Sequence, residues 1–243
     1  MTADDRAVDG AFVDVRDLGD AIVAVVSEGE SLWAPHYQVP EAEWRRYLPD
    51  ADAAGRAWFG LNVVLVRLGE ALVAIDPGLD DPGTALARDF GERFASWDIE
   101  IVRTPGLAAA MAQLGWESDS VTHVVITHAH FDHYAGAVIE RDGVLIPRFP
   151  NARHFVGRAD WEGNPERAEP DSDLNRRLGA INAWGLLEVV DGEREIAPGV
   201  TLLPSPGETP GHLAVRVNSV DRSLYVLGDL VHHACEVEHL DWV

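Results

Sequence analysis

The sequence predicts an α+β protein, in which helices and strands both contribute to the core. Segments with the β-branched, alternating pattern of strands outnumber helical segments, and the helical segments lie between groups of strands. No unit of about 20 to 50 residues repeats along the chain, which excludes a repeat architecture. No stretch among the 243 residues resembles a linker, so we expect a single domain over residues 1–243.

The N-terminal part of the chain is expected to form a hairpin followed by a long loop. β-branched residues on both sides of a turn at Gly19 indicate two strands within residues 12–26. Residues 28–60 are rich in aromatic residues and prolines and show no sustained period, so we expect a loop with one short helix there.

Two apolar strands are expected next, and both lead towards a polar turn. They span residues 62–68 and 71–75 and are joined by a turn at Gly69. The second strand ends in Asp76-Pro77-Gly78, a sequence typical of a turn at a strand end.

The rest of the chain is expected to alternate between helices and strands. A helix can be capped by Thr104, with Pro105 in its first turn and Gly115 at its end, and it leads into a β-branched strand at residues 121–127. Further strands are expected at residues 153–156, 187–190, 200–204, 213–217 and 223–227, and further helices at residues 159–162 and 173–184.

The composition excludes several classes of partner and of chemistry. The chain has 41 acidic and 19 basic side chains and a formal net charge of −22, which repels nucleic acid phosphates and anionic membrane surfaces. Every basic side chain is an arginine, so no lysine can form a Schiff base or act as a nucleophile. Cys235 is the single cysteine, which excludes an internal disulfide and a thiolate metal cluster.

No targeting or membrane-spanning segment is evident. Residues 1–10 are acidic and lack the basic and apolar regions of a signal peptide. No apolar run reaches the roughly 18 residues that a membrane span requires. We therefore expect a cytoplasmic protein that acts on a small molecule and has no nucleic acid or membrane partner.

A cluster of potential metal ligands follows the strand at residues 121–127. His128, His130, Asp132 and His133 fall within six consecutive positions. In extended backbone the first three share one face, and a turn at the strand end can bring His133 beside them. Imidazole nitrogens and carboxylate oxygens are donors that suit zinc. With histidine at 10 of 243 positions such a cluster rarely arises by chance, so we expect a metal site here.

The segment THAHFDHYAG, at residues 127–136, resembles the signature of the metallo-β-lactamase superfamily. Three further motifs agree with this family in order and spacing: Asp76 in AIDPG, His212 in ETPGH and Asp229 in VLGDL. The agreement extends over residues 62–230. The resemblance implies an αββα sandwich of two mixed β-sheets flanked by helices, with metal ions at one edge between the sheets.

The resemblance also implies a dinuclear zinc site. The implied ligands of one zinc ion are His128, His130 and His212, those of the second are Asp132 and His133, and the carboxylate of Asp229 bridges the two. Asp76 would order the loop through hydrogen bonds without binding metal.

This site implies a hydrolase. Two divalent ions about 3.5 to 4 Å apart lower the pKa of a bridging water towards 7, which supplies hydroxide at neutral pH, and one ion can polarise a carbonyl or phosphoryl oxygen. Asp132 would orient the hydroxide as a catalytic residue and carry its proton to the leaving group. The GxSxG motif of serine hydrolases is absent. We therefore expect hydrolysis of an ester, a lactone or a phosphotriester.

The C-terminal part departs from the family pattern. Family members usually supply one more histidine to the second metal, some tens of residues after the position of Asp229, and this sequence ends at Val243. We expect that C-terminal elements of the fold are missing and that the second site is weak, completed by water or empty. His232 lies where related lactonases and phosphotriesterases often place a residue close to the substrate. We therefore expect a catalytic role for His232 and none as ligands for His233 and His239.

Two alternatives to this function stay open. The segments TPGH and GDLVHH look most like the lactonase and organophosphate hydrolase branch of the family. A mononuclear iron enzyme similar to the persulfide dioxygenases shares these ligands, however, and a truncated domain could bind metal without catalysis. A homodimer is compatible with the resemblance, because related hydrolases are often dimers.

Overall fold

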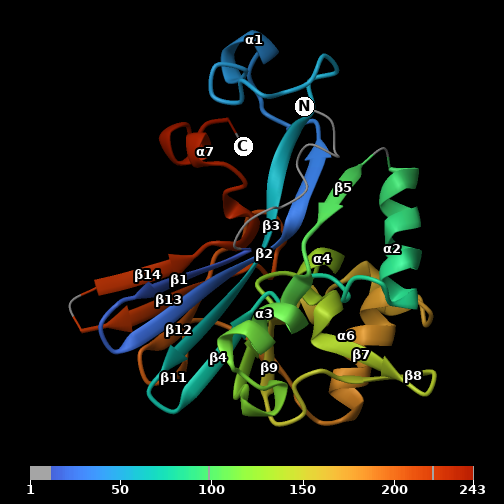
Figure 1. Ribbon diagram of the computed structural model, residues 1–243, viewed down its shortest axis with the longest axis vertical. Coiled ribbons are helices and arrows are strands. Elements are labelled where there is room, and N and C mark those ends of the chain that lie inside the picture. Colours follow the sequence, from blue (N-terminus) through green and yellow to red (C-terminus); the bar gives the residue numbers. More distant parts are fainter. Residues whose placement is uncertain (1–11, 98, 221, 243) are drawn as a thin grey trace.

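Two β-sheets lie face to face at the centre of the molecule, which we describe from a computed structural model covering residues 12–97, 99–220 and 222–242 (Figure 1). The first sheet contains β1 (Val13–Asp17), β2 (Ala21–Trp33), β3 (Ala57–Leu68), β4 (Ala71–Ile75), β5 (Glu100–Arg103), β6 (His123–Val125), β9 (Arg153–Gly157) and β10 (Leu187–Val190). Its order is β1-β2-β3-β4-β6-β9-β10, and β5 also pairs with β2. Strands β1 to β4 run antiparallel, whereas β4, β6, β9 and β10 run parallel, so the sheet is mixed.

The second sheet is smaller and antiparallel throughout. It contains β11 (Arg194–Ala197), β12 (Val200–Pro204), β13 (Leu213–Ser219) and β14 (Arg222–Val226), in that order. The connections between these consecutive strands are shorter than the dozen or so residues that a parallel crossover needs. The α+β class and the two-sheet fold are confirmed, but the second sheet is not mixed as predicted.

Helices cover one face of the first sheet. The chain forms α1 (Glu41–Trp44), α2 (Ala85–Ser96), α3 (Gly106–Leu114), α4 (Phe131–Tyr134), α5 (Arg158–Trp161), α6 (Asp173–Ala183) and α7 (Ala234–Glu238). Helices α2, α3, α4 and α6 lie on the side of the first sheet that faces away from β11–β14 (Figure 1). In the part of the chain that the structure describes, Figure 1 shows no helix on the outer face of β11–β14.

Alternation along the strands separates two hydrophobic clusters, one on each face of the first sheet. Val26 faces the helices and belongs to the same cluster as Leu107 of α3 and Leu178 of α6. Val23, three positions earlier on β2, belongs to the cluster between the sheets, together with Val215 of β13. Successive strand residues point to opposite faces, so one strand supplies both clusters. Each buried aliphatic side chain contributes roughly 1.5 to 3 kcal/mol to stability.

The predicted N-terminal hairpin is present, but its second strand is longer than predicted. β2 continues to Trp33 and bulges between Ser27 and Gly29, so the polar residues that follow Val26 are strand and not loop. The predicted loop is therefore limited to residues 34–56, with α1 as its short helix. The elements α2, β5, β11, α7 and the small hairpin of β7 (Val138–Arg141) and β8 (Val144–Pro147) were not predicted.

The segment after the second sheet packs against this loop. Trp44, Phe59, Cys235 and Trp242 are members of one buried cluster, and the backbone N–H of Gln38 donates to the carbonyl of Trp242 at 2.8 Å. The cluster places α7 close to α1 (Figure 1). Among the residues described, none of the helices has the length and apolar character to cross a membrane.

Candidate metal centre

Three parallel strands of the first sheet end at the same edge, and polar residues follow each of them. Asp76 follows β4, His128 lies shortly after β6, and Asp160 lies shortly after β9. The carboxyl ends of neighbouring parallel strands are the common position for functional residues in such sheets. The topology therefore brings together residues that are far apart in the sequence.

Asp76 holds the loop that carries the histidines. Its carboxylate accepts hydrogen bonds from the backbone N–H of Thr127 at 2.7 Å and from the Thr127 hydroxyl at 2.6 Å. The second of these oxygens also lies 2.9 Å from Nδ1 of His133. Asp76 has a φ of 48° and is 5% exposed, so a buried carboxylate in left-handed backbone orders the loop. The resemblance implies this role for Asp76.

His128 is oriented so that Nε2 of its ring faces the other potential ligands. The Thr127 hydroxyl donates its proton to Asp76, so its oxygen accepts from Nδ1 of His128, which lies 3.1 Å away. This fixes the tautomer and leaves a lone pair on Nε2. Burial, with a smaller contribution from nearby His133, lowers the pKa of His128 to about 2, so the ring is neutral.

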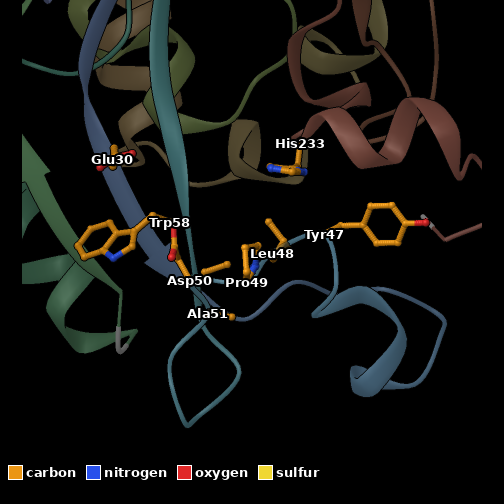
Figure 2. Close-up of a pocket in the computed structure, with 9 residues that line it drawn as sticks. Glu30, Tyr47, Leu48, Pro49, Asp50, Ala51, Trp58 and His233 are labelled. Atoms are coloured by element: carbon orange, nitrogen blue, oxygen red, sulfur yellow. The ribbon is translucent and has the colours of Figure 1, made fainter. Parts of the chain in front are cut away.

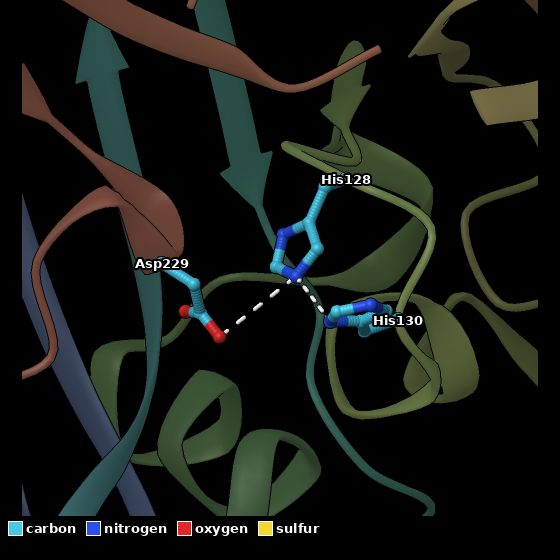
Figure 3. Close-up of side chains that lie close together, drawn as sticks. All are labelled: His128, His130 and Asp229. Atoms are coloured by element: carbon cyan, nitrogen blue, oxygen red, sulfur yellow. Dashed lines mark hydrogen bonds and ion pairs between the residues drawn. The ribbon is translucent and has the colours of Figure 1, made fainter. Parts of the chain in front are cut away.

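His128, His130 and Asp229 bring three donor atoms to within 4.8 Å of one another (Figure 3). Nε2 of His128 lies 2.9 Å from Nδ1 of His130 and 3.8 Å from Oδ2 of Asp229. His130 is the most exposed of the three, at 47% of its side chain, and its Nδ1 also lies 3.5 Å from the carboxylate of Glu208. Two imidazoles and one carboxylate thus face a common point.

His212 presents a third imidazole to the same region. Its ring centroid lies 5.2 Å from that of His128, and its Nδ1 lies 2.9 Å from the hydroxyl of Ser205. Nε2 of His212 is buried and has no hydrogen-bond partner. A buried polar atom without a partner is costly in a folded protein, which indicates that this nitrogen has a ligand to bind.

His133 also lies beside Asp229, and Asp132 lies beside His133. Nε2 of His133 lies 3.3 Å from Oδ2 of Asp229 and 3.7 Å from Oδ2 of Asp132. Burial opposes a charge on His133, but the neighbouring carboxylates of Asp76 and Asp132 outweigh it and raise the pKa of His133. Burial likewise opposes a charge on Asp229, but hydrogen bonds from His133 and His232 hold the pKa of Asp229 well below its usual value. Asp229 is therefore ionised.

His232 also faces Asp229. Its Nε2 lies 3.5 Å from Oδ2 of Asp229, and its backbone N–H donates to Oε2 of Glu236 at 2.7 Å. Burial lowers the pKa of His232, but the interactions with Asp229 and Glu236 outweigh this and raise the pKa to about 10. His232 therefore lies beside Asp229, and its predicted catalytic role stays a prediction.

The donor set fits divalent metal ions. His128, His130 and His212 present ring nitrogens, Asp132 and Asp229 present carboxylates, and these are the donors that zinc takes in catalytic sites. The unpartnered Nε2 of His212 is the strongest structural sign of a ligand. The backbone leaves room for one as well: a Cβ on Gly228 would lie 2.6 Å from that nitrogen.

A family model confirms what the motifs indicate. Residues 56–242 match the model described as the metallo-beta-lactamase superfamily. The chain belongs to this superfamily. The fold class and the family resemblance are thereby confirmed.

Curated relatives are hydrolases and lactonases. A probable metallo-hydrolase of Mycobacterium tuberculosis is 29% identical over 188 residues, which cover 71% of this chain and 57% of the relative. An N-acyl homoserine lactonase of Bacillus cereus is 24% identical over 165 residues, which cover 67% of this chain and 60% of the lactonase. The chain thus spans less than two thirds of the length of these relatives.

Solved structures share the fold at low sequence identity. A probable metal-dependent hydrolase from Staphylococcus aureus superposes with a TM-score of 0.70 at 21% identity, covering 88% of this chain and 75% of that protein. AidC, a dizinc quorum-quenching lactonase in complex with a homoserine product, superposes with a TM-score of 0.64 at 21% identity, covering 90% of this chain and 75% of AidC. These matches show the metallo-β-lactamase fold.

Sequence reasoning missed Asp160, which joins two loops of the metal centre. Its carboxylate accepts from the backbone N–H of Ala129 at 2.8 Å, the hydroxyl of Thr209 at 2.7 Å and the backbone N–H of Gly211 at 2.7 Å. Asp160 is 3% exposed and so links the loop of His128 to the loop of His212 inside the protein. Its position after a parallel strand was the only signal in the sequence.

The six predicted ligands all lie at this edge, and their roles as ligands stay a prediction. A pocket of about 210 Å³ lies elsewhere, beside the N-terminal loop (Figure 2). It is lined by Glu30, Tyr47, Leu48, Pro49, Asp50, Ala51, Ala57, Trp58 and His233. None of the six predicted ligands lines this pocket.

Proposed function

We propose that the protein is a metal-dependent hydrolase that binds two zinc ions and cleaves an ester, lactone or phosphotriester bond of a small molecule. The observation that carries this proposal is the convergence of His128, His130 and Asp229 within 4.8 Å, next to the buried and unpartnered Nε2 of His212. Membership of a superfamily whose curated relatives include metallo-hydrolases supports the same reaction class.

The proposed ligands divide into two sets that share Asp229. His128, His130 and His212 would hold one ion, and Asp132 and His133 would contribute to the second. Bound divalent ions lower the pKa of water and polarise a carbonyl or phosphoryl oxygen. Thr127 and Ser205 keep the ring nitrogens of His128 and His212 directed at the ions by bonding the opposite nitrogen of each ring.

Asp132 is proposed to transfer a proton from the attacking water to the leaving group. Its side chain is 27% exposed, so it reaches both the site and solvent, and Oδ2 lies 3.7 Å from Nε2 of His133. A carboxylate in this position can accept a proton from water and deliver it to the leaving group. His232, at 26% exposure, lies beside Asp229.

The proposed substrate is an uncharged or weakly charged ester or lactone with an apolar part. Trp33 stacks on Phe59 with ring centroids 4.2 Å apart, and His232 meets the Trp33 ring edge-on at 5.5 Å. An aromatic wall beside the metal centre suits an apolar substituent. The net charge of −22 disfavours polyanionic substrates. The lactonase relatives and AidC support lactones within this class. A cytoplasmic location and a homodimer stay predictions.

The test combines metal analysis with a substrate screen. The protein, purified without chelator, should contain zinc by elemental mass spectrometry and should hydrolyse members of a lactone, aryl ester and phosphotriester panel. His130→Ala removes a proposed ligand whose side chain is about half exposed, so folding should persist while kcat/KM falls at least about 100-fold. His233→Asn serves as the control and should retain both metal and activity.

Three outcomes would overturn the proposal. A folded protein that takes up no metal would exclude metal-dependent hydrolysis. One iron per chain with oxygen consumption would favour the dioxygenase-like alternative. Unchanged activity in His130→Ala would place the reaction elsewhere.

A further inference from the structure

Two buried arginines contact the segments that carry part of the metal centre. Arg177 lies in α6 and is 3% exposed, and Arg148 follows β8 and is 6% exposed. Burial of a charged side chain is costly unless it is paired and hydrogen-bonded. Both arginines lie outside the set of proposed ligands, so their contacts show what they do.

Arg177 joins the turn that follows β4 to the short helix α4. It donates to both carboxylate oxygens of Asp80, at 2.7 and 2.8 Å, and to the carbonyl of Ala135 at 3.0 Å. Its guanidinium also lies over the ring of Phe131, 4.7 Å from the centroid. Phe131 begins α4 and Ala135 follows its last residue. Arg177 therefore contacts both ends of the helix that carries two of the proposed ligands.

Arg148 repeats this arrangement one residue further along both segments. It donates to the carboxylate of Asp81 at 2.8 Å and to the carbonyl of Gly136 at 2.6 Å. The two backbones also touch directly, because the N–H of Gly136 donates to the carbonyl of Gly78 at 2.8 Å. A Cβ on Gly136 would clash with the carbonyl oxygen of Pro77. The two segments are thus joined by side chains and by backbone.

The joined segments carry residues of the metal centre. Asp76 begins the first segment, and His133 and the adjacent Asp132 lie in the second. Nδ1 of His133 lies 2.9 Å from the carboxylate of Asp76, so the segments also meet at the site itself. Movement of one segment relative to the other would change this contact and displace two proposed ligands. The contacts of the two arginines therefore bear on the geometry of the donors.

We propose that Arg177 and Arg148 are positioning residues of the metal centre, which hold α4 against the turn of Asp76 before a metal ion binds. This inference rests on the proposed metal-dependent function. Arginine suits the role because its planar guanidinium can bind a carboxylate and donate to a carbonyl at the same time. Lysine keeps the charge but has a single nitrogen on a flexible chain, so it cannot reproduce both contacts in this geometry.

The experiment compares Arg177→Lys and Arg148→Lys with Ile196→Ala, a control for loss of stability. Ile196 is a buried residue of β11 in the cluster between the sheets, whose described members include none of residues 76–81 or 131–136. Its truncation leaves a cavity far from the arginine contacts in the contact network and destabilises the fold. Chemical denaturation of the metal-free proteins measures stability, and circular dichroism checks that each is folded.

Metal binding is measured without reference to activity. Each metal-free protein is titrated with Zn²⁺ against a chromophoric chelator, and the bound metal is counted by elemental mass spectrometry. Co²⁺ loading adds a spectroscopic readout, because the visible absorption of Co²⁺ depends on the positions of its ligands. A residue that only stabilises the fold would leave these readouts unchanged.

Hydrogen exchange of the wild type tests the same point without a substitution, in case a variant does not fold. The amide of Gly136, which donates to Gly78, should be protected in the metal-free protein as strongly as in the zinc-loaded protein. Rapid exchange without zinc, with protection only after zinc is added, would show that the metal orders these segments and that the arginines do not.

We expect Ile196→Ala to lose stability but to keep the zinc affinity and Co²⁺ bands of the wild type. Each lysine variant should bind zinc at least about tenfold more weakly and show shifted Co²⁺ bands. If Arg177→Lys is folded and binds zinc and Co²⁺ as the wild type does, the arginine has only a structural role and the inference is wrong, while the proposed function stands. A wild type that binds no metal overturns the proposed function and this inference with it.

Discussion

The two walls of the metal centre are held in place by different kinds of contact. The sheet wall, which carries Asp76, His128 and Asp160, is fixed by buried carboxylates that accept backbone N–H groups. The C-terminal wall, which carries Asp229 and His232, rests mainly on side-chain contacts around a short turn and α7. The comparison indicates that changes in the sheet wall act on the stability of the fold, whereas changes in the C-terminal wall act on metal binding.

Asp160→Ala should have the largest effect on stability. Removing the carboxylate leaves the buried N–H groups of Ala129 and Gly211 without a partner. Each unsatisfied buried donor costs about 1 to 3 kcal/mol, so the free energy of unfolding should fall by about 3 to 5 kcal/mol. Chemical denaturation measures this, with Asp191→Ala as a control because the side chain of Asp191 is 77% exposed. Equal free energies of unfolding for Asp160→Ala and Asp191→Ala would contradict the claim that the sheet wall stabilises the fold.

Glu28 should make the stability of the fold around the sheet wall depend on pH. Its carboxyl group accepts from the backbone N–H groups of Leu79 and Leu107, next to the turn that follows Asp76. Burial raises the pKa of Glu28 from 4.5 to about 7, so the folded state holds a proton between these pH values that the unfolded state has lost. This stabilising contribution is complete below pH 4.5 and is lost as the pH rises through 7, a change of about 3 kcal/mol.

The measurement compares the wild type with Glu28→Gln by denaturation from pH 4.5 to 8. Glutamine does not ionise, so Glu28→Gln should lack this pH dependence. As the pH rises, the free energy of unfolding of the wild type should therefore fall relative to that of Glu28→Gln. Parallel pH profiles would contradict the assignment.

Gly228→Ala tests the point where the two walls meet. Gly228 has a φ of 54°, and an added Cβ would lie 2.6 Å from Nε2 of His212 and 2.7 Å from the hydroxyl oxygen of Thr127. Gly69 has a φ of 57° and open space around it, so Gly69→Ala carries only the backbone cost of about 1 to 2 kcal/mol. Thermal unfolding should show that cost in both variants, whereas metal analysis should show loss of zinc only in Gly228→Ala. Zinc retained by Gly228→Ala would mean that His212 is not a ligand.

Tyr37→Phe should have the smallest effect on stability, about 1 kcal/mol, because one hydrogen bond to Glu236 is lost and the ring packing is kept. Glu236 also contacts His232, whose predicted role is catalytic, so kcat/KM should fall as well, by a few-fold. Tyr47→Phe is the matched control, since the Tyr47 ring packs against the same Trp242. Unchanged kcat/KM in Tyr37→Phe would limit the role of Glu236 to structure.

Much of this architecture was predictable from local patterns. The end of α3 at Gly115, which has a φ of 66°, follows from a capping signal, and the strands before and after His128 follow from β-branched runs. Their parallel pairing did not follow from the sequence pattern. Thr104 lies two residues before α3, and its hydroxyl accepts from the backbone N–H of Gly106, the first residue of that helix, at 3.2 Å. The same hydroxyl donates to the carbonyl of Ser27 at 2.7 Å, so the predicted capping residue also makes a contact with a distant strand.

Polar strand residues explain the largest difference from the prediction. The end of β2 contains Glu28 and Ser31, which interrupt the apolar alternation, yet these residues are 1% and 5% exposed. This part of the strand pairs with both β3 and β5, and Glu28 reaches backbone donors of other loops. Such partners are supplied by distant parts of the chain, so no pattern within residues 28–33 reveals them.

The residues of the site were predictable where potential ligands lie close together in the sequence. Residues that only hold those ligands in position, through contacts made in the folded chain, were not predictable. His128 to His133 stand out because they are adjacent, and Asp229 because its motif resembles that of a known family. Asp160 and Glu236 stand in ordinary sequence surroundings, and only the folded chain shows that they hold the donors in position.

Asp160 also ties together two layers that could otherwise slide past each other. His128 extends from the first sheet, and His212 immediately precedes β13 of the second; the backbone N–H of Leu213 donates to the carbonyl of Thr127 at 2.7 Å. The spacing of the imidazoles is therefore set by how the sheets are stacked. If His128 and His212 bind one ion, as proposed, that ion would oppose sliding of one sheet over the other, and metal binding would stabilise the folded state.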